Sequence, residues 1–229
     1  MSAPPFATGV TPFKIYGHRG SPRRRTENTA ASFEETIRAG ADGFETDLRL
    51  LSDRVAVLYH DDDLDTDEVE SLSSADVVER GHVVQQLSSL AEFAGRTTMI
   101  LEVKRSKWEE MLVEHVSHWP DVVVASFDHS TIHWLHQREV SFPLGITVFG
   151  YLLDLPDYAQ RIGASWCFPG YHYVDEELVR ELHARRIRVV PWTPNREREW
   201  ERLRAIGCDG VITDLPAEAV AWRDGVAAV

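Results

Sequence analysis

The sequence predicts an α/β fold, a (β/α)8 TIM barrel in which eight parallel strands alternate with eight helices. Three observations predict it. Short apolar runs recur along the whole chain, most are followed by a segment with the periodicity of an amphipathic helix, and the 229 residues match the length of one such barrel. The runs are apolar on both faces, which is typical of a parallel sheet covered on both sides. An open, doubly wound sheet is the structural alternative.

The predicted strands are the apolar runs that are rich in branched and aromatic side chains. They lie at residues 14–16, 43–48, 99–103, 122–127, 144–149, 165–168, 189–192 and 210–213. The predicted helices lie at roughly 29–39, 87–94, 107–118, 130–138, 155–162, 175–185, 195–206 and 216–223. Glycines directly follow several of these helical segments, and Ser130 and Asp175 are typical N-cap residues for two of them.

One strand-like run, at residues 55–60, has no place among the eight parallel strands. Only residues 52–54 separate it from residues 45–51, the extended end of the second predicted strand, whereas a parallel crossover needs a dozen or more residues. We therefore expect it to fold back as the second arm of a hairpin, with residue 46 opposite residue 59 or 60. This register would bring His60 beside Glu45 and Asp47. The predicted barrel thus carries an extra hairpin strand after its second strand and a short insertion.

The composition predicts a single domain over residues 1–229, with the barrel core at 13–220. Cys167 and Cys208 lie in separate apolar segments, which favours two buried thiols in a reducing compartment. The N-terminal sequence lacks the pattern of a secretory signal, and no stretch is apolar enough to span a membrane. We therefore expect a soluble, cytoplasmic protein without stable membrane insertion. A homodimer is one possible assembly.

The formal net charge of −13 argues against a protein that binds a nucleic-acid backbone, because such a protein needs a basic face. It also limits how the chain could bind an anionic small molecule. The positive charge would have to be local, from a metal ion and a few cationic side chains in one pocket.

Carboxylates cluster at the predicted carboxyl ends of the strands, where barrel enzymes place their active sites. Glu45 and Asp47 are two residues apart on one strand, so both point to one face, and Glu102 lies near the end of the next parallel strand. Burying carboxylates together is costly unless a cation lies between them. Oxygen ligands suit hard ions, so we expect Mg²⁺ or Ca²⁺ rather than zinc. Ion pairs with Arg19 and Lys104 are the alternative interpretation.

Two histidines are placed for proton transfer, because His18 follows the first strand and His60 ends the hairpin. Cleavage of a phosphodiester requires a base for the nucleophile and an acid for the leaving alkoxide, and each contributes about 10²–10⁴ in rate. Arg19 and Lys104 are the natural ligands for the phosphate. The residues therefore predict a metal-dependent phosphodiester hydrolase.

Eight short motifs together resemble the glycerophosphodiester phosphodiesterase family across residues 13–220. They are Gly17-His18-Arg19-Gly20, Glu27-Asn28-Thr29, Phe44-Glu45-Thr46-Asp47, Leu58-Tyr59-His60-Asp61, Leu101-Glu102-Val103-Lys104, Ser126-Phe127, Trp192-Thr193-Pro194-Asn195 and Gly210-Val211-Ile212-Thr213-Asp214.

The resemblance implies a (β/α)8 barrel that hydrolyses deacylated phospholipids to sn-glycerol 3-phosphate and an alcohol. It implies that Mg²⁺ or Ca²⁺ binds to the three carboxylates and that the two histidines form the acid–base pair. Arg19 and Lys104 would hold the phosphate, with Glu27 and Trp192 close by.

Three departures from the family pattern leave the alcohol part of the substrate open. Thr26 and Pro194 replace the usual Pro and Val, and the segment after His60 is short and acidic. One alternative is a lysophospholipase D or a phosphoinositide phospholipase C-like enzyme, which would need an apolar rim that the acidic segment argues against. Another is a non-catalytic metal-binding barrel, which would be expected to lack a histidine or a metal ligand. The sequence leaves water and the substrate's own 2-hydroxyl open as nucleophiles.

Overall fold

The computed structural model describes residues 12–225, and it contains all eight predicted parallel strands. The ends of the predicted single domain, residues 1–11 and 226–229, lie outside the described residues. The strands are β1 (Lys14–Gly17), β2 (Gly43–Leu50), β7 (Thr98–Val103), β8 (Val122–Ser126), β9 (Leu144–Val148), β10 (Trp166–Pro169), β11 (Arg188–Val189) and β12 (Gly210–Thr213).

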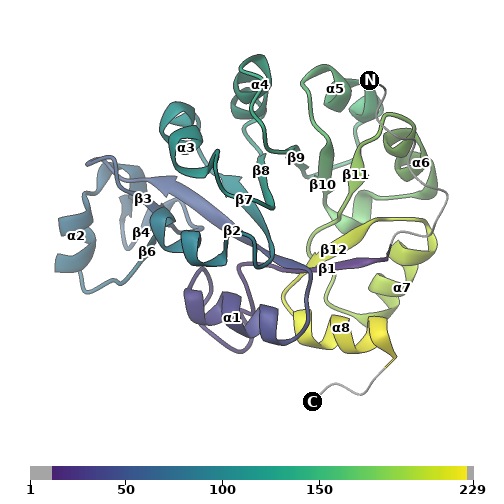
Figure 1. Cartoon of the computed structure of the whole chain (residues 1–229), viewed down its shortest axis with the longest axis horizontal. Coiled ribbons are helices and arrows are strands. Elements are labelled where there is room, and N and C mark those ends of the chain that lie inside the picture. Colours follow the sequence, from purple (N-terminus) through teal and green to yellow (C-terminus); the bar gives the residue numbers. More distant parts are fainter. Residues whose placement is uncertain (1–11, 226–229) are drawn as a thin grey trace.

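The strands form a ring in the order β11-β10-β9-β8-β7-β2-β1-β12 (Figure 1). The two ends of this order meet at Trp192, which forms parallel bridges to Gly170 on one side and to Ile212 on the other. In addition, the N–H of Ile212 donates to the carbonyl of Pro191 at 2.9 Å. The barrel therefore closes through isolated contacts rather than a full ladder, and β11 is shorter than expected because Pro191 has no N–H to donate.

Helices surround the ring (Figure 1). They are α1 (Ala30–Arg38), α3 (Glu109–Val116), α4 (His129–Gln137), α5 (Leu155–Arg161), α6 (Glu176–Ala184), α7 (Glu197–Ala205) and α8 (Pro216–Asp224). The segment expected as a helix at 87–94 is instead the 3-10 helix η2 (Leu87–Phe93). Asp175 caps α6 as predicted, but the cap of α4 is Asp128 rather than Ser130, because the Asp128 carboxylate accepts from the Ser130 N–H at 3.1 Å. Among the described residues, no helix is both long enough and apolar enough to cross a bilayer.

The predicted hairpin is present, because β3 (Ala56–Leu58) runs antiparallel to β2 with Leu48 opposite Leu58. The N–H of Tyr59 donates to the carbonyl of Asp47 at 3.1 Å, so residue 46 faces residue 60 as expected. The insertion that follows contains more regular structure than predicted. It comprises β4 (Asp63–Leu64), β5 (Asp67–Glu68), η1 (Val69–Ser71), α2 (Ser74–Glu79) and β6 (Gln85–Gln86).

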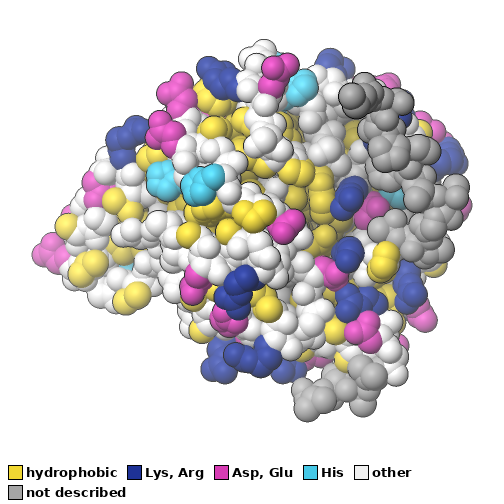
Figure 2. All heavy atoms as spheres, in the orientation of Figure 1, with side chains coloured by type: hydrophobic (Ala, Val, Ile, Leu, Met, Phe, Trp, Pro, Cys, Tyr) yellow, Lys and Arg dark blue, Asp and Glu magenta, His cyan; other side chains and the backbone are white. Residues whose placement is uncertain are grey.

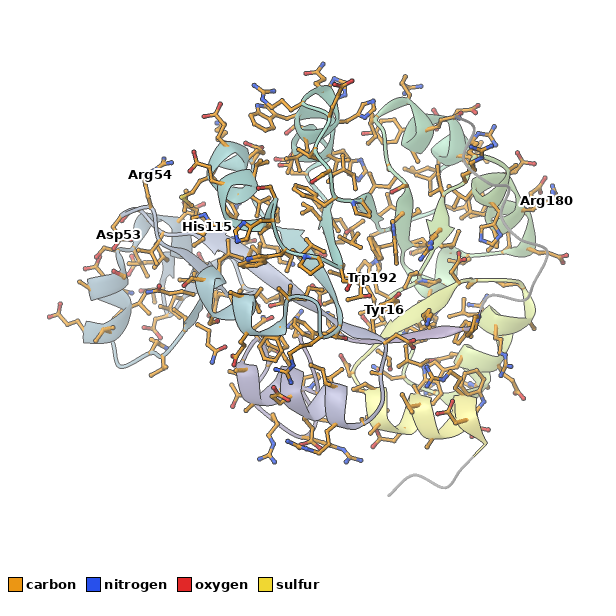
Figure 3. The ribbon with its side chains drawn as sticks, in the orientation of Figure 1. Tyr16, Asp53, Arg54, His115, Arg180 and Trp192 are labelled. Carbon is orange, nitrogen blue, oxygen red and sulfur yellow. The ribbon has the colours of Figure 1, made fainter. Side chains whose placement is uncertain are left out.

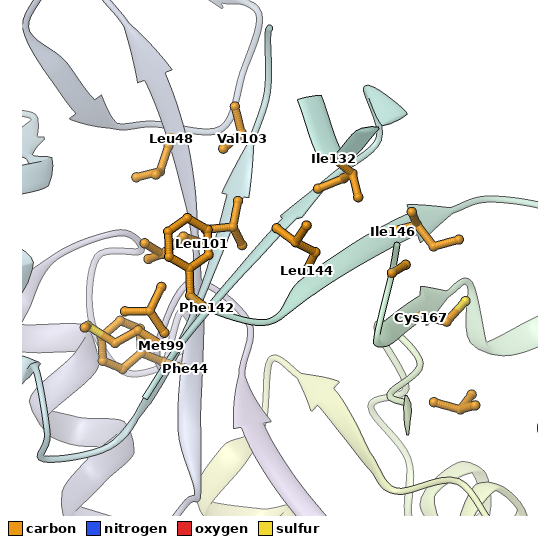
Figure 4. Close-up of a cluster of buried hydrophobic side chains, with 14 of the residues drawn as sticks. Phe44, Leu48, Met99, Leu101, Val103, Ile132, Phe142, Leu144, Ile146 and Cys167 are labelled. Atoms are coloured by element: carbon orange, nitrogen blue, oxygen red, sulfur yellow. The ribbon is translucent and has the colours of Figure 1, made fainter. Parts of the chain in front are cut away.

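The barrel core has two layers, one on each face of the strands, as continuously apolar strands require, and a separate apolar cluster lies in the insertion. The outer layer fills the space between strands and helices, and Figure 4 shows Phe44, Leu101, Leu144 and Cys167 within it. The inner layer fills the barrel with Tyr16, Ile100, Val123, Ala125, Trp166, Phe168, Val190 and Ile212. Both cysteines are buried and free, as predicted. The face seen in Figure 2 carries both acidic and basic side chains around its edge.

Candidate active site

A pocket opens among the carboxyl ends of the barrel strands, and all predicted site residues except Glu27 line it. Its lining divides into two parts. The charged half comes from β1, β2, β7 and the hairpin and consists of His18, Arg19, Glu45, Asp47, His60, Glu102 and Lys104. The apolar half comes from Ile100 of β7 and from the strands that follow β7 and their ends, and consists of Ile100, Ala125, Phe127, Thr147, Phe168, Trp192 and Ile212. Figure 3 shows Trp192 near the middle of the ring of strands.

The tight turn after β1 places Arg19 over the carboxylates. Gly17 must lack a side chain, because a Cβ there would lie 2.2 Å from the carbonyl oxygen of Gly20. Arg19 itself adopts a left-handed backbone with φ of 55°, which is uncommon for a residue with a long side chain. Its N–H thereby donates to Glu45 Oε2 at 3.1 Å, and its guanidinium donates to Glu27 at 2.9 Å. Glu27 thus contacts Arg19 rather than the pocket itself.

Asn28 orients Asp47, a role that sequence reasoning missed. Its side-chain amide donates to Asp47 Oδ2 at 2.9 Å, and its carbonyl oxygen accepts from the Thr46 hydroxyl at 2.7 Å. Asn28 also has a left-handed backbone, with φ of 54°, which asparagine tolerates better than most residues. The sequence signal that could have identified Asn28 was its place in the Glu27-Asn28-Thr29 motif.

The three predicted metal-binding carboxylates lie together and are almost fully buried. Glu45, Asp47 and Glu102 are 4%, 1% and 8% exposed, and Asp47 is directly opposite Glu102 on the neighbouring strand. The Lys104 ammonium contacts both Glu102 and Asp47, at 2.7 Å from Asp47 Oδ1. Arg19 Nε is 3.2 Å from Asp47 Oδ2. The ion pairs of the alternative interpretation are therefore present around Asp47 and Glu102.

These contacts shift the pKa values of the two β2 carboxyls in opposite directions. Burial raises the pKa of Glu45 well above its ordinary value, and the negative charges of Asp47 and Glu102 raise it further. Burial acts the same way on Asp47, but Lys104, Arg19 and the Asn28 amide outweigh it and lower the pKa of that carboxyl. Arg19 and Lys104 thus form ion pairs with Asp47, and Lys104 also pairs with Glu102, whereas within residues 12–225 neither side chain forms an ion pair with Glu45.

The donor set fits a hard divalent cation, since it offers only carboxylate oxygens and since the charges of Lys104 and Arg19 do not offset burial and the neighbouring carboxylates at Glu45. Within residues 12–225, however, no group of three His, Cys, Asp or Glu side chains is already arranged to hold a metal ion. The Lys104 ammonium contacts two of the three carboxylates and supplies a positive charge there. Metal binding at this site therefore stays a prediction.

Both histidines are oriented in the same way, each with its Nδ1 against a carboxylate. His18 Nδ1 is 2.7 Å from Asp214 Oδ1, and His60 Nδ1 is 2.7 Å from Asp61 Oδ1. Asn195 in turn donates to Asp214 Oδ2 at 2.8 Å. A partner at Nδ1 fixes the tautomer and leaves Nε2 of each ring for the pocket. Sequence reasoning named Asp214 and Asn195 as members of two motifs but did not pair either with His18.

The apolar half contains an aromatic cluster around Trp192. Phe127 meets Trp192 edge to face, with ring centroids 5.6 Å apart, and Phe149 lies 5.9 Å from the same ring. The Trp192 indole N–H donates to the carbonyl of Phe168 at 2.9 Å. Thr147 adds one polar atom to this half, a buried hydroxyl that has no hydrogen-bond partner in the described part of the chain. Of these residues, sequence reasoning assigned a role at the site only to Trp192.

The sequence matches the model of the glycerophosphoryl diester phosphodiesterase family over residues 18–91 and 75–218. The chain belongs to this family. A protein from Bacillus altitudinis named glycerophosphodiester phosphodiesterase is 28% identical over 92% of this chain and 98% of its own length. A human protein named lysophospholipase D is 25% identical over 89% of this chain and 82% of its own length.

Solved structures of family members share the fold. A phosphodiesterase from Oleispira antarctica, solved in complex with the product sn-glycerol-3-phosphate, superimposes with a TM-score of 0.83 at 21% identity over 92% of this chain and 96% of its own. A second structure, from Galdieria sulphuraria, gives a TM-score of 0.82 at 22% identity over 95% of this chain and all of its own. The predicted family and barrel are therefore confirmed, and this family member is an enzyme of the phosphodiester hydrolase class, as predicted.

Proposed function

We propose that this enzyme hydrolyses glycerophosphodiesters to sn-glycerol 3-phosphate and an alcohol, with His18 and His60 as its acid–base pair. The observation that carries the proposal is that both histidines, each oriented by a carboxylate at Nδ1, share one pocket with the buried carboxylates and with Arg19 and Lys104. The relatives named for this activity, and the neighbour solved with sn-glycerol-3-phosphate, support the substrate class.

Glu45, Asp47 and Glu102 would hold a divalent cation, Mg²⁺ or Ca²⁺. When bound, such an ion polarises a phosphoryl oxygen and adds positive charge where the transition state becomes more negative. The fit rests on the buried, oxygen-only donor set and on the raised pKa of Glu45, which burial and the neighbouring carboxylates cause.

The side chains of the charged half divide the remaining work. One histidine accepts a proton from the attacking hydroxyl, which belongs to water or to the substrate. The other histidine donates a proton to the alkoxide that leaves phosphorus. Asp214 and Asp61 stabilise the protonated rings, and Arg19 and Lys104 stabilise the charge on the phosphoryl oxygens.

Alanine at either histidine tests the assignment. We expect His18→Ala and His60→Ala each to lose at least about 10²-fold in turnover of glycerophosphocholine, the lower end for a positioned acid or base. His172→Ala is the matched control and should leave turnover unchanged, because His172 is exposed on the short 3-10 helix η3 (Tyr171–Tyr173) after β10. Turnover near the normal rate in either pocket variant would refute the assignment.

A lysophospholipase D reaction is a second candidate, and one observation favours it. The rim that such a reaction requires is present, because the apolar half includes Phe127 at 45% exposure beside Trp192. A human relative carries that name. The non-catalytic alternative loses support, since both histidines and all three carboxylates share the pocket.

A further inference from the structure

Arg49 is a buried cation to which the proposed chemistry assigns no role. It is 2% exposed, and it follows Glu45 and Asp47 at the same two-residue spacing on β2, so all three side chains point to one face of the strand. Arg49 nevertheless does not line the pocket. Burying a guanidinium is costly unless its charge is paired and its N–H groups find acceptors, so its contacts indicate what it holds.

One side of the Arg49 guanidinium holds the backbone of His60. Its Nε and Nη2 groups both donate to the His60 carbonyl oxygen, at 3.2 and 2.8 Å. The strand β3 ends at Leu58, two residues before His60, so the regular antiparallel ladder does not include the histidine. The Arg49 side chain therefore attaches the chain to β2 at a point beyond the end of the ladder.

The other side of Arg49 is held by the insertion. Nη1 donates to Glu70 at 2.6 Å, and Nη2 donates to Asp62 at 2.7 Å. The second carboxylate oxygen of Glu70 is buried and has no hydrogen-bond partner in the described part of the chain, so Arg49 compensates the charge of this carboxylate. Figure 1 shows the insertion, with α2, β4 and β6, beside β3 at one edge of the molecule. The insertion thus fixes the cation that holds His60.

The backbone contact matters because the imidazole of His60 has only one other fixed point. His60 Nδ1 lies 2.7 Å from Asp61 Oδ1, and the ring lines the pocket. The Asp61 side chain is 71% exposed, so this contact alone holds the ring weakly. A displacement of about 1 Å can cost a reacting group about 10²-fold in rate. Arg49 supplies the buried contact that such precision requires.

We propose that Arg49 is a positioning residue, which holds His60 in place for proton transfer and is itself held by Asp62 and Glu70 of the insertion. This inference rests on the proposed function, in which His60 belongs to the acid–base pair. Arginine is required because its planar fork makes four hydrogen bonds in three directions. A lysine ammonium is a single donor point and cannot reproduce them.

Arg49→Lys tests the role, because it keeps the charge and removes the fork. We expect kcat for glycerophosphocholine to fall at least about tenfold with KM within about twofold, since His60 is displaced while the other pocket residues stay. Arg223→Lys is the matched control, because Arg223 donates to Asp42 at 2.7 Å and to the Gly40 carbonyl at 3.4 Å but lies outside the pocket. It should keep the parent kcat, even where Tm falls.

Two results of this comparison would overturn the proposal. One is an Arg49→Lys variant with the kcat of the parent enzyme. The other is an equal loss of kcat in Arg49→Lys and Arg223→Lys, which would show that the loss follows from general destabilisation. Circular dichroism and Tm of each variant complete the comparison.

Combining Arg49→Lys with His60→Ala shows whether Arg49 acts through the histidine. Without the imidazole there is nothing left to position, so Arg49→Lys should change the kcat of the His60→Ala enzyme by less than about twofold. A general structural role predicts a further loss of about tenfold instead, because Glu45 and Asp47 lie on the same strand as Arg49. That further loss would contradict the proposal.

The same variants separate this inference from the proposed function. If His60→Ala loses activity as expected while Arg49→Lys keeps it, the proposed function stands and the Arg49 inference fails. If His60→Ala hydrolyses glycerophosphocholine near the normal rate, the proposed acid–base pair fails, and the inference fails with it.

Discussion

The two halves of the pocket differ in what they offer a substrate. The charged half, on β1, β2, β7 and the hairpin, carries the acids, bases and cations, and most of them are held by contacts to one another. The apolar half, mostly on the strands after β7, offers ring faces and the hydroxyl of Thr147, which has no hydrogen-bond partner within residues 12–225. The difference indicates that the first half carries out the chemistry and the second selects what is bound.

The largest expected effect is the loss of kcat when Lys104, in the charged half, is replaced. Lys104→Met keeps the length of the side chain but removes its charge, and removal of one group that stabilises transition-state charge typically costs about 10²–10³ in kcat. Phe127→Leu, in the apolar half, should change kcat for glycerophosphocholine by less than about threefold, because it removes no polar contact. Steady-state kinetics of both variants, with circular dichroism as a folding control, makes the comparison. Similar losses of kcat in the two variants would contradict the claim that only the charged half carries out the chemistry.

A smaller effect is expected where a residue acts through a histidine. Asp214→Asn should lower kcat at least about tenfold with little change in KM, since it removes the charge that orients His18 and stabilises its protonated form. The variant Asp214→Glu should recover part of the loss.

Asp214→Asn also has a pH signature. Burial would raise the pKa of Asp214, but the hydrogen bond and charge of His18 outweigh it and lower that pKa. A carboxyl whose pKa is lowered in the folded state stabilises the fold at pH values above its ordinary pKa. This stabilisation is lost as the pH falls through the lowered pKa. The variant should therefore be less stable than the parent near neutral pH, and the difference in Tm should vanish in strong acid. A difference in Tm that stays constant across pH would show that the charge of the Asp214 carboxylate does not cause it.

The smallest expected effect lies in the apolar half. The Thr147 hydroxyl is buried at the pocket without a partner among the described residues, so a substrate hydroxyl would satisfy it. We expect Thr147→Val to raise KM about fivefold with kcat nearly unchanged, the typical range for one neutral hydrogen bond. An unchanged KM would show that the substrate does not reach Thr147.

The charged half was largely predictable because its geometry follows from short-range rules. Alternation along a strand puts Glu45 and Asp47 on one face, and the hairpin register places His60 near them. The partners of these residues were harder to find. Asp214 is distant from His18 in sequence, and Asn28 reaches Asp47 only through a left-handed turn.

The apolar half could not be predicted from the sequence, for a different reason. Phe127 and Phe149 end apolar strands, and in sequence they cannot be told from core residues. Only the closed ring shows that they stand exposed at the mouth. The regular structure of the insertion escaped prediction because its strands are two residues long and its helix α2 only six, too short to show a period.

The most direct test of the central claim is the dependence of the reaction on a divalent cation. Release of sn-glycerol 3-phosphate from glycerophosphocholine would be measured after EDTA treatment and again after Mg²⁺, Ca²⁺ or Mn²⁺ is added, with Tm recorded in parallel. Because the pKa of Glu45 is raised and a cation needs the ionised carboxyl, the rise in Tm with cation should be larger near neutral pH than in mild acid. We expect EDTA to abolish activity and at least one ion to restore it; full activity in EDTA would contradict the account.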